Sequence, residues 1–157
     1  DFTKDLLSTM LKQMGKGITR QRLIDLGLEL RKKDGNAALI KILSRKINED
    51  NNYVIAGIRY PDEVLFLRSK FGDRFRLLAV KCKLGIRFER TLKFYEVKKK
   101  TYGGRDPDFK EFLKHEDLPT EKIIKRTMRM ANFSISNNGS KEEFLQKVDN
   151  LVKRLKI

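Results

Sequence analysis

Cysteine and histidine are almost absent from this 157-residue chain, which holds one of each and no tryptophan. A single cysteine excludes an internal disulfide framework, and Cys82 lies in the apolar run LLAVKC, which favours a reduced, half-buried thiol. The same scarcity predicts no metal site, and we expect His115 on the surface. No apolar run approaches the roughly 20 residues of a membrane-spanning helix. We therefore expect an intracellular protein of a reducing compartment, cytoplasm or organellar matrix, with no membrane partner.

Acidic residues are few relative to basic ones: 21 Asp and Glu stand against 36 Lys and Arg, a formal net charge of +15. Such an excess attracts polyanions such as nucleic acid, nucleotide phosphates or an anionic surface. A lysine-rich surface without such a partner would have the same composition, so charge alone leaves both interpretations open. The first residue is Asp1 and not methionine, and we expect that the chain is trimmed, processed or incompletely represented.

Apolar spacing divides the chain into helices and a few short strands. The predicted helices cover residues 1–15, 19–35, 36–47, 61–72, 84–101, 108–118, 119–131 and 140–157. Short apolar runs with β-branched and aromatic residues predict strands at 53–57, 76–81 and 132–136. Several helix ends follow from capping residues. Thr19 begins and Gly35 ends the second helix, Asn36 caps the third, and Pro61 and Gly72 delimit the fourth. A capping box of Ser140 with Glu143 opens the last helix.

Short apolar strands that alternate with helices predict a three-layer α/β fold, with a parallel sheet and helices on both faces. No internal repeat or low-complexity linker divides the chain, so we expect one domain, residues 1–157. In such sheets ligands bind beyond the carboxyl ends of the strands. Arg59 stands between a predicted strand and a helix N-terminus, where a guanidinium can hold a phosphate through two hydrogen bonds. A pairing of Arg59 with Glu63 explains the same pattern, and local sequence favours neither.

Four segments, in this order, resemble the P-loop nucleotide kinases: YVIAGIRYPDEV, LLAVKCKLGIRFERTLK, GGRDPDFKEFLKHED and MANFSISNNGSKEEF. Within that superfamily they resemble the dephospho-coenzyme A kinase-like and deoxynucleotide monophosphate kinase-like ATPases. The upstream segment ITRQRLIDLGLELRKKDGNAAL is similar to the same group, so the resemblance covers nearly the whole chain. Each motif alone is weak, and their shared order and spacing carry the resemblance. It implies phosphoryl transfer from ATP, with Mg²⁺, to a nucleotide or another phosphate-bearing small molecule.

The resemblance also implies three groups of site residues. They are Arg59, Arg31 and Gly57 at the acceptor's phosphate; Arg87, Arg90 and Arg105 as catalytic residues at the transferred phosphate; and Asn138 and Gly139 near the adenine of ATP. Arg105 belongs to a lid-like helical insertion over residues 84–117. Arg87 and Arg90 are three residues apart on one helix and point the same way. A solvated basic helix face is the alternative interpretation of that pair.

The G-x-x-x-x-G-K-[ST] loop that holds the donor phosphates in these kinases is missing from the sequence. The segment MGKGITR at 14–20 has a Gly-Lys pair, but with the wrong spacing and no strand before it. In the family this loop follows a central strand that lies between those predicted here at 53–57 and 76–81. We therefore expect a strand-loop-helix unit of about 30 residues upstream of Asp1. The alternative is a rearranged sheet in which the two strands close up directly.

Three acids of the family's motifs are replaced as well. Ala56 takes the place of the acid in the I-D-G-I-R pattern, while Asn132 and Asn138 replace acids around the last strand. Their loss near a phosphate site would make that site more positive and less suited to a metal ion.

Two functions follow. The first is a nucleotide kinase whose P-loop lies upstream. The second is a catalytically degenerate kinase fold that serves as a basic, RNA-binding structural subunit of a ribonucleoprotein assembly. In the second, RNA would be contacted by Lys93, Lys98, Lys99, Lys100 and Tyr102, beside Phe94 and Tyr95. Packing of these aromatic side chains against the helix is the alternative. In either case we expect that residues 1–157 alone neither hydrolyse ATP nor transfer its phosphate.

Overall fold

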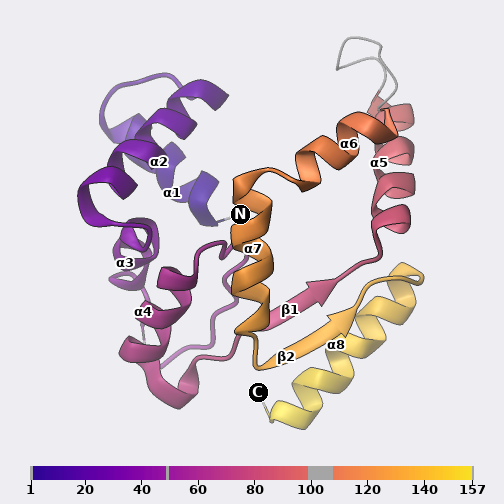
Figure 1. Ribbon diagram of the computed structural model, residues 1–157. Helices are drawn as coiled ribbons and strands as arrows, with labels where there is room; N and C mark the ends of the chain where they lie inside the picture. The colour runs from indigo at the N-terminus through magenta and orange to yellow at the C-terminus, as the bar shows by residue number, and fades with distance from the viewer. Residues whose placement is uncertain (1, 49, 99–107, 157) are drawn as a thin grey trace. The chain divides into compact units, whose positions relative to one another are not determined.

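The structure is a computed structural model that describes residues 2–48, 50–98 and 108–156 (Figure 1). The chain divides into two compact units, Asp1–Phe75 and Arg76–Ile157. Among the described residues, no helix combines the length and the apolarity that a membrane span requires.

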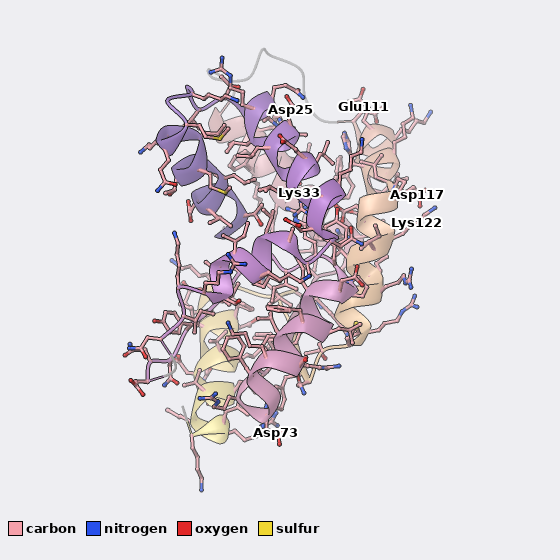
Figure 2. All side chains as sticks on the ribbon, turned by 90° about the vertical axis from the view of Figure 1, so that its left-hand side faces the viewer. Asp25, Lys33, Asp73, Glu111, Asp117 and Lys122 are labelled. Atoms are coloured by element: carbon pink, nitrogen blue, oxygen red, sulfur yellow. The ribbon has the colours of Figure 1, made fainter. Side chains whose placement is uncertain are left out.

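The first unit is helical. Its elements are α1 (Phe2–Gln13), α2 (Arg20–Asp34), α3 (Ala38–Ser44), α4 (Pro61–Phe71) and the short 3₁₀ helix η1 (Gly72–Arg74). The predicted ends of α2 are confirmed: the Thr19 side chain accepts the backbone N–H of Arg22 at 3.2 Å, and Gly35 closes the helix at φ 82°. Pro61 and Gly72 delimit α4 as predicted. The outer side of α2 carries exposed charged side chains such as Asp25 and Lys33 (Figure 2).

The prediction that Asn36 caps the third helix is wrong. Ala37 occupies the cap position of α3 and makes no side-chain cap hydrogen bond. The Asn36 amide instead donates to the Asp62 carboxylate at 2.7 Å, which ties the start of α3 to the start of α4. A side-chain partner 26 positions away outcompetes the local cap, and sequence spacing does not reveal such a partner.

Two clusters of buried apolar side chains form the core of the first unit. One joins α1, α2 and α3 through Leu6, Leu7, Leu11, Leu26 and Leu39, and the other joins α3 and α4 through Ala37, Ile40 and Leu67. Leu39 and Ile40 are adjacent in α3 and both are 0% exposed. Helix α3 therefore contributes to both clusters, and burial of each such side chain contributes about 1.5–3 kcal/mol.

The strand predicted at 53–57 does not form in the structure. Residues 52–60 have no regular secondary structure, and no strand among the described residues pairs with them. Tyr53 and Val54 are 49% and 100% exposed, while Ile55 and Ile58 pack against the second core cluster. The apolar run was interpreted as a buried strand. A strand, however, needs a hydrogen-bonded neighbour, and the described residues supply none here.

The second unit is α/β. Its elements are β1 (Leu78–Lys81), α5 (Leu84–Lys98), α6 (Phe109–Glu116), α7 (Pro119–Arg129), β2 (Phe133–Ser136) and α8 (Lys141–Leu155). Strands β1 and β2 pair in parallel, with Leu78 opposite Phe133 and Val80 opposite Ile135. The parallel strands predicted near 76–81 and 132–136 are thus confirmed in two four-residue strands. The predicted capping box opens α8, where the Ser140 hydroxyl accepts the Glu143 N–H at 3.2 Å.

The sheet of the second unit is incompletely covered. Leu78, Val80, Phe133 and Ile135 share one face, because opposed residues of paired strands point the same way. Among the described residues of this unit, Ala79 is the one apolar residue that is fully buried, whereas Val80 is 44% exposed. Helix α8 packs on β2 and leaves the β1 part of this face more open. The described residues therefore contain a two-stranded parallel sheet with little closed core, and not a larger three-layer sheet.

Candidate anion-binding site

The site that sequence reasoning placed around Arg59 lies in the first unit, at the start of α4. Gly57 has φ 98°, a left-handed conformation that glycine adopts without steric cost. This turn precedes Arg59 and Tyr60, and Pro61 then begins α4. Proline suits that first helical position, since its fixed φ is helical and no N–H is lost from the helix. Local chemistry therefore fixes where the chain enters the helix and where Arg59 stands.

Glu63 holds this entry segment in place. Its side chain is 1% exposed. One carboxylate oxygen, Oε2, accepts the backbone N–H of Arg59 at 2.8 Å and that of Tyr60 at 3.0 Å. The two peptide groups just before α4 are thus anchored by a single buried oxygen.

Burial raises the pKa of the Glu63 carboxyl above its ordinary value of 4.5. The two backbone hydrogen bonds act in the opposite direction, because they favour the ionised form. The positive charges of Arg31 and Arg59 also lower this pKa, though by less than burial raises it. The pairing of Arg59 with Glu63 that the sequence offered is thus found in the structure as a hydrogen bond donated by the Arg59 backbone N–H.

Arg31 enters the same cluster from α2. Its guanidinium carbon lies 5.0 Å from the centre of the Tyr60 ring, a cation–π arrangement. Its Nη1 donates weakly to the Gly27 carbonyl at 3.4 Å, while its Nε is buried without a hydrogen-bond partner among the described residues. The Tyr60 ring and the α2 backbone thus limit where this guanidinium can point.

The structure brings together Arg31, Gly57 and Arg59, the three residues assigned to an acceptor phosphate. Arg31 and Arg59 come from separate segments, yet both act electrostatically on the same buried carboxylate. Two arginines beside one buried carboxylate are candidate ligands for an anion. Such a site can bind a phosphate or a similar oxyanion through charge-assisted hydrogen bonds.

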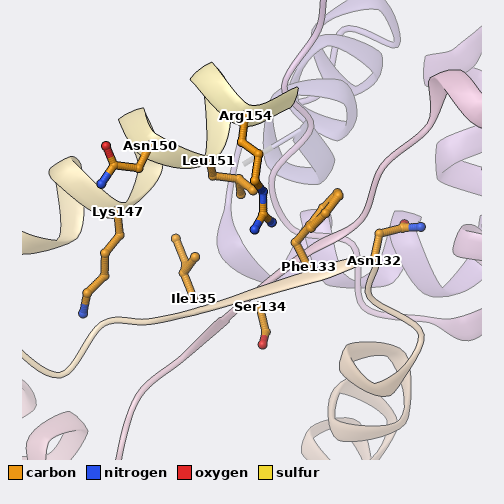
Figure 3. Close-up of a pocket in the computed structure, with 8 residues that line it drawn as sticks. All are labelled: Asn132, Phe133, Ser134, Ile135, Lys147, Asn150, Leu151 and Arg154. Carbon is orange, nitrogen blue, oxygen red and sulfur yellow. The ribbon is translucent and has the colours of Figure 1, made fainter. Parts of the chain in front are cut away.

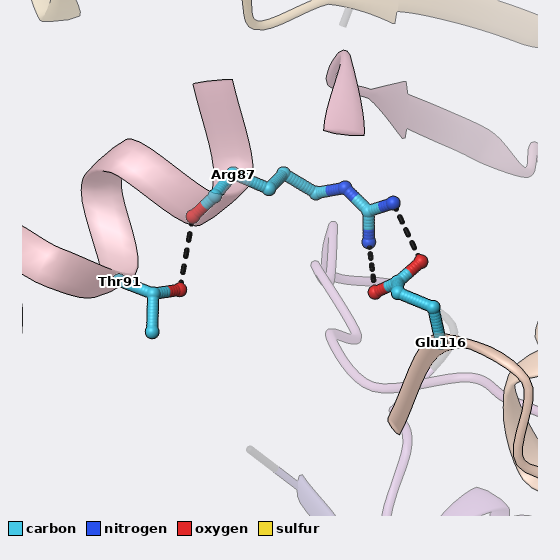
Figure 4. A network of polar contacts seen from close by, with 3 residues as sticks. All are labelled: Arg87, Thr91 and Glu116. Atoms are coloured by element: carbon cyan, nitrogen blue, oxygen red, sulfur yellow. Dashed lines mark hydrogen bonds and ion pairs between the residues drawn. The ribbon is translucent and has the colours of Figure 1, made fainter. Parts of the chain in front are cut away.

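Arg87, assigned to the transferred phosphate, is paired within the second unit. Its Nη1 and Nη2 donate to the two carboxylate oxygens of Glu116, each at 2.6 Å (Figure 4). Its guanidinium also lies 6.0 Å from the centre of the Phe112 ring, and its backbone carbonyl accepts the Thr91 hydroxyl at 2.9 Å. The pair joins α5 to α6, while 38% of the Arg87 side chain stays exposed to solvent. Its assigned role at a phosphate stays a prediction.

Arg90 contacts the turn assigned to adenine. Its Nη1 donates to the Asn137 carbonyl and its Nη2 to the Gly139 carbonyl, both at 2.8 Å. The Asn138 side chain accepts the Lys83 backbone N–H at 2.9 Å, which ties the same turn to the end of β1. Arg90, Asn138 and Gly139 therefore form one local cluster, although sequence reasoning placed Arg90 with Arg87.

Asn132 and Asn138 occupy opposite ends of the sheet. The Asn132 side chain accepts the Leu77 backbone N–H at 2.9 Å, just before β1 and β2 begin. Asn138 follows β2 at the carboxyl edge, where ligands bind in parallel sheets. The expectation that both replaced acids lie at one phosphate site is therefore wrong for Asn132, whose amide caps the amino edge.

Several predicted residues lie outside the described part of the chain. These are Arg105 of the lid-like insertion, and Lys99, Lys100 and Tyr102 of the RNA hypothesis. Lys98 ends α5, but its side chain is likewise not described. Of the RNA set, Lys93 is exposed, and the Phe94 ring is 53% exposed and meets the Tyr95 ring edge-on at 6.0 Å. Packing thus covers less than half of Phe94.

A pocket of about 520 Å³ lies between β2 and α8 (Figure 3). Its lining residues are Asn132, Phe133, Ser134, Ile135, Lys147, Asn150, Leu151 and Arg154. Lys147 Nζ donates to the Ser136 carbonyl and hydroxyl, both at 3.1 Å, and the Arg154 guanidinium lies 5.4 Å from the centre of the Phe133 ring. Both cations are thus engaged within the protein. Asn138 and Gly139, assigned to adenine, do not line this pocket.

Sequence reasoning missed the central role of Glu63 and the pairing of Glu116. The sequence offered Glu63 as a possible partner of Arg59. Its hydrogen bonds to the backbone could have been predicted from its position three residues after Tyr60. A glutamate at that helix position reaches back to the N–H groups that precede the helix. No comparable signal existed for Glu116, which lies 29 positions from Arg87.

Comparison with known proteins yields relatives but no matching family model. The chain is 33% identical over 156 residues to a UPF0200/UPF0201 protein of Archaeoglobus fulgidus, an alignment that covers 96% of this chain and 46% of that protein. It is 28% identical over 158 residues to a UPF0200 protein of Thermococcus onnurineus, and this alignment covers 96% of this chain and 81% of that protein. The chain thus spans about half the length of the Archaeoglobus relative. These names specify no activity, ligand or partner.

Proposed function

We propose that this chain is a nucleotide-kinase-like domain that binds a nucleotide, or a nucleotide-like molecule, through its phosphate. Arg59 and Arg31 are the anion-binding residues, and Gly57 gives the backbone turn that presents Arg59. Phosphoryl transfer from ATP with Mg²⁺ requires a P-loop, which residues 1–157 do not contain. On this proposal the chain alone binds phosphate but does not transfer it.

The observation that carries the proposal is a local cluster: Glu63 Oε2 accepts the backbone N–H groups of Arg59 and Tyr60, and the Arg31 guanidinium lies 5.0 Å from the centre of the Tyr60 ring. Like charges repel unless an anion offsets them, so two arginines that share a site need a counter-charge. Glu63 provides one negative charge in the unliganded protein, and its own hydrogen bonds go to the backbone. A bound phosphate would make charge-assisted hydrogen bonds with these guanidinium groups.

The proposal includes a fold, the three-layer sheet of P-loop kinases, and the central strand of that sheet would not be among these residues. The arrangement of the described strands supports this part of the proposal. The described sheet consists of β1 and β2 alone. Residues 52–60 run without regular structure and pair with no described strand. Both features are expected if β1 and residues 53–57 each pair with a strand from another segment.

Calorimetric titration with AMP and with inorganic phosphate tests the proposal. We expect binding of both ligands at low salt, weakened about tenfold or more by Arg59→Ala or Arg31→Ala, since each removes a charge-assisted contact worth about 1.5–3 kcal/mol. Arg20→Ala is the matched control, because it removes an exposed arginine at the start of α2. Equal affinities of wild-type protein and Arg59→Ala, or no binding at all, would overturn it.

RNA binding is a second candidate, favoured by one observation. The Phe94 ring is more than half exposed, beside the exposed Lys93, on a basic helix. An exposed aromatic ring next to cations can stack on a base while the cations contact phosphates. Single-stranded RNA binding that weakens steeply with salt and weakens further in Phe94→Ala would support it. Binding that Phe94→Ala leaves unchanged would count against it.

A further inference from the structure

The Glu63 carboxylate occupies an unusual position for an anion site: it carries negative charge where the proposed ligand would bring more. Its side chain is 1% exposed, its Oε2 accepts the Arg59 backbone N–H at 2.8 Å, and the Arg31 guanidinium lies against the ring of the neighbouring Tyr60. A bound oxyanion near these arginines would repel the ionised carboxylate, because like charges at short range destabilise each other. The ligand and ionised Glu63 are therefore electrostatic competitors for the same two guanidinium groups.

The hydrogen bonds of Glu63 do not depend on its full charge. Both backbone donors, the N–H groups of Arg59 and Tyr60, use the same oxygen, Oε2. A protonated carboxyl keeps a carbonyl oxygen that can accept both bonds, and its O–H can lie on the other oxygen. Protonation thus removes the negative charge and leaves the acceptor that anchors the chain.

We propose that Glu63 makes anion binding at Arg31 and Arg59 proton-linked, so that the protein takes up a proton at Glu63 when it binds a dianionic oxyanion. The inference rests on the proposed function of these arginines. Anion affinity then rises as the pH falls through the titration of Glu63. By reciprocity, a bound anion makes Glu63 more basic by the same factor.

The groups around Glu63 make this assignment specific. The charges that act on it are those of Arg31 from α2 and Arg59 from the segment before α4. Asp62, its neighbour on α4, is hydrogen-bonded to Asn36. The single histidine of the sequence, His115, belongs to the second unit. Burial holds the pKa of Glu63 above that of an ordinary glutamate, which moves its titration towards neutral pH.

Sulfate is the probe for the test, because it stays a dianion where phosphate changes its charge. Sulfate affinity is measured by calorimetry between about pH 5 and about pH 7.5, at constant ionic strength, to cover a carboxyl with a raised pKa. Wild-type protein should lose about fivefold or more in affinity from the lowest to the highest pH. Glu63→Gln keeps an acceptor oxygen without the charge, and its affinity should be high and flat across the range.

The matched control is Glu29→Gln. It makes the same change in net charge on an exposed side chain of α2, two positions from Arg31 and thus on another side of the helix. Its pH profile should follow that of the wild-type protein. A Glu63→Gln profile that also follows the wild type would overturn the inference.

Proton uptake provides a second measurement that needs no variant. Titrations of wild-type protein near pH 6 in buffers of different ionisation enthalpy report the protons taken up per sulfate bound. We expect a positive fraction of one proton, and zero uptake accompanying sulfate binding would overturn the inference. If sulfate does not bind, or binds Arg59→Ala equally well, the proposed function fails. If binding needs Arg59 but shows no proton linkage, the inference alone fails.

Discussion

Glu63 and Arg59 are joined by a hydrogen bond in which the buried Oε2 of the glutamate accepts the backbone N–H of the arginine at 2.8 Å. The same oxygen accepts the Tyr60 N–H, so the last two residues before α4 share one anchor. Through this anchor, a residue inside the helix fixes the position of a residue outside it. The arrangement explains how an exposed arginine can keep a defined place without a strand beneath it.

Replacement of Glu63 should change how stability depends on pH. A glutamate whose pKa is raised in the folded protein costs stability when it ionises, so its penalty is absent below the ordinary value of 4.5 and grows as the pH rises through the folded value. Glu63→Gln keeps an acceptor and has no such penalty. We expect wild-type protein to lose free energy of unfolding relative to Glu63→Gln over this range, as measured by urea denaturation. A pH-independent difference would contradict the assignment.

Gly57→Ala should destabilise the protein by about 1–2 kcal/mol, because a side chain at φ 98° is strained. The strain should also shift Arg59 and weaken phosphate binding. Gly85→Ala is the control: Gly85 lies in α5, and an added methyl group there meets nothing within 4 Å. That substitution should be neutral or stabilise by up to about 1 kcal/mol. Chemical denaturation measures the free energy of unfolding of both variants. Equal changes in Gly57→Ala and Gly85→Ala would refute the role of the Gly57 turn.

The Arg87–Glu116 pair should contribute a modest coupling energy between α5 and α6. The two side chains are 38% and 15% exposed, so solvent screens part of the attraction. A double-mutant cycle with Arg87→Gln and Glu116→Gln should give about 0.5–1.5 kcal/mol at low salt, and less at high salt. Glu111→Gln, an exposed position on α6, is the control and should show no coupling to Arg87. Coupling equal to that control would show that the pair adds nothing to stability.

Leu39→Ala should be among the most damaging substitutions in the first unit. Leu39 is 0% exposed in the cluster that joins the first three helices, and loss of its side chain should cost about 2–5 kcal/mol. Leu28→Ala on α2, where the side chain is 59% exposed, should change stability by less than about 0.5 kcal/mol. Thermal or urea unfolding measures the stability of both variants. A similar loss of stability in Leu39→Ala and Leu28→Ala would contradict the packing described for α3.

The helices could be predicted from the sequence because their signals are local. Thr19 and Gly35 around α2, and Ser140 with Glu143 at α8, act within a few residues of the helix end they mark. The strand at 53–57 could not be predicted in this way, since a strand depends on a neighbour that may lie anywhere in a chain or outside it. An apolar run indicates only that a segment tends to be buried.

The candidate site was predicted in part. Arg59 and Arg31 were assigned together by resemblance, and the structure places both near Glu63. Arg90 was assigned to a transferred phosphate, yet its hydrogen bonds go to carbonyls 47 and 49 positions away. No spacing within the sequence encodes that contact. The contact between Arg59 and the nearby Glu63 could thus be anticipated from the sequence, whereas the contacts of Arg90 across the fold could not.

The central claim, that Arg31 and Arg59 together bind an oxyanion, is tested most directly by NMR of the arginine side chains during a phosphate titration. Each Nε–Hε signal reports the surroundings of one guanidinium, and variants at positions 31 and 59 assign the two signals. The account predicts that both signals shift together, with one shared dissociation constant, before those of Arg20 and Arg154. Unchanged signals of Arg31 and Arg59 at phosphate concentrations that shift the other arginines would contradict it.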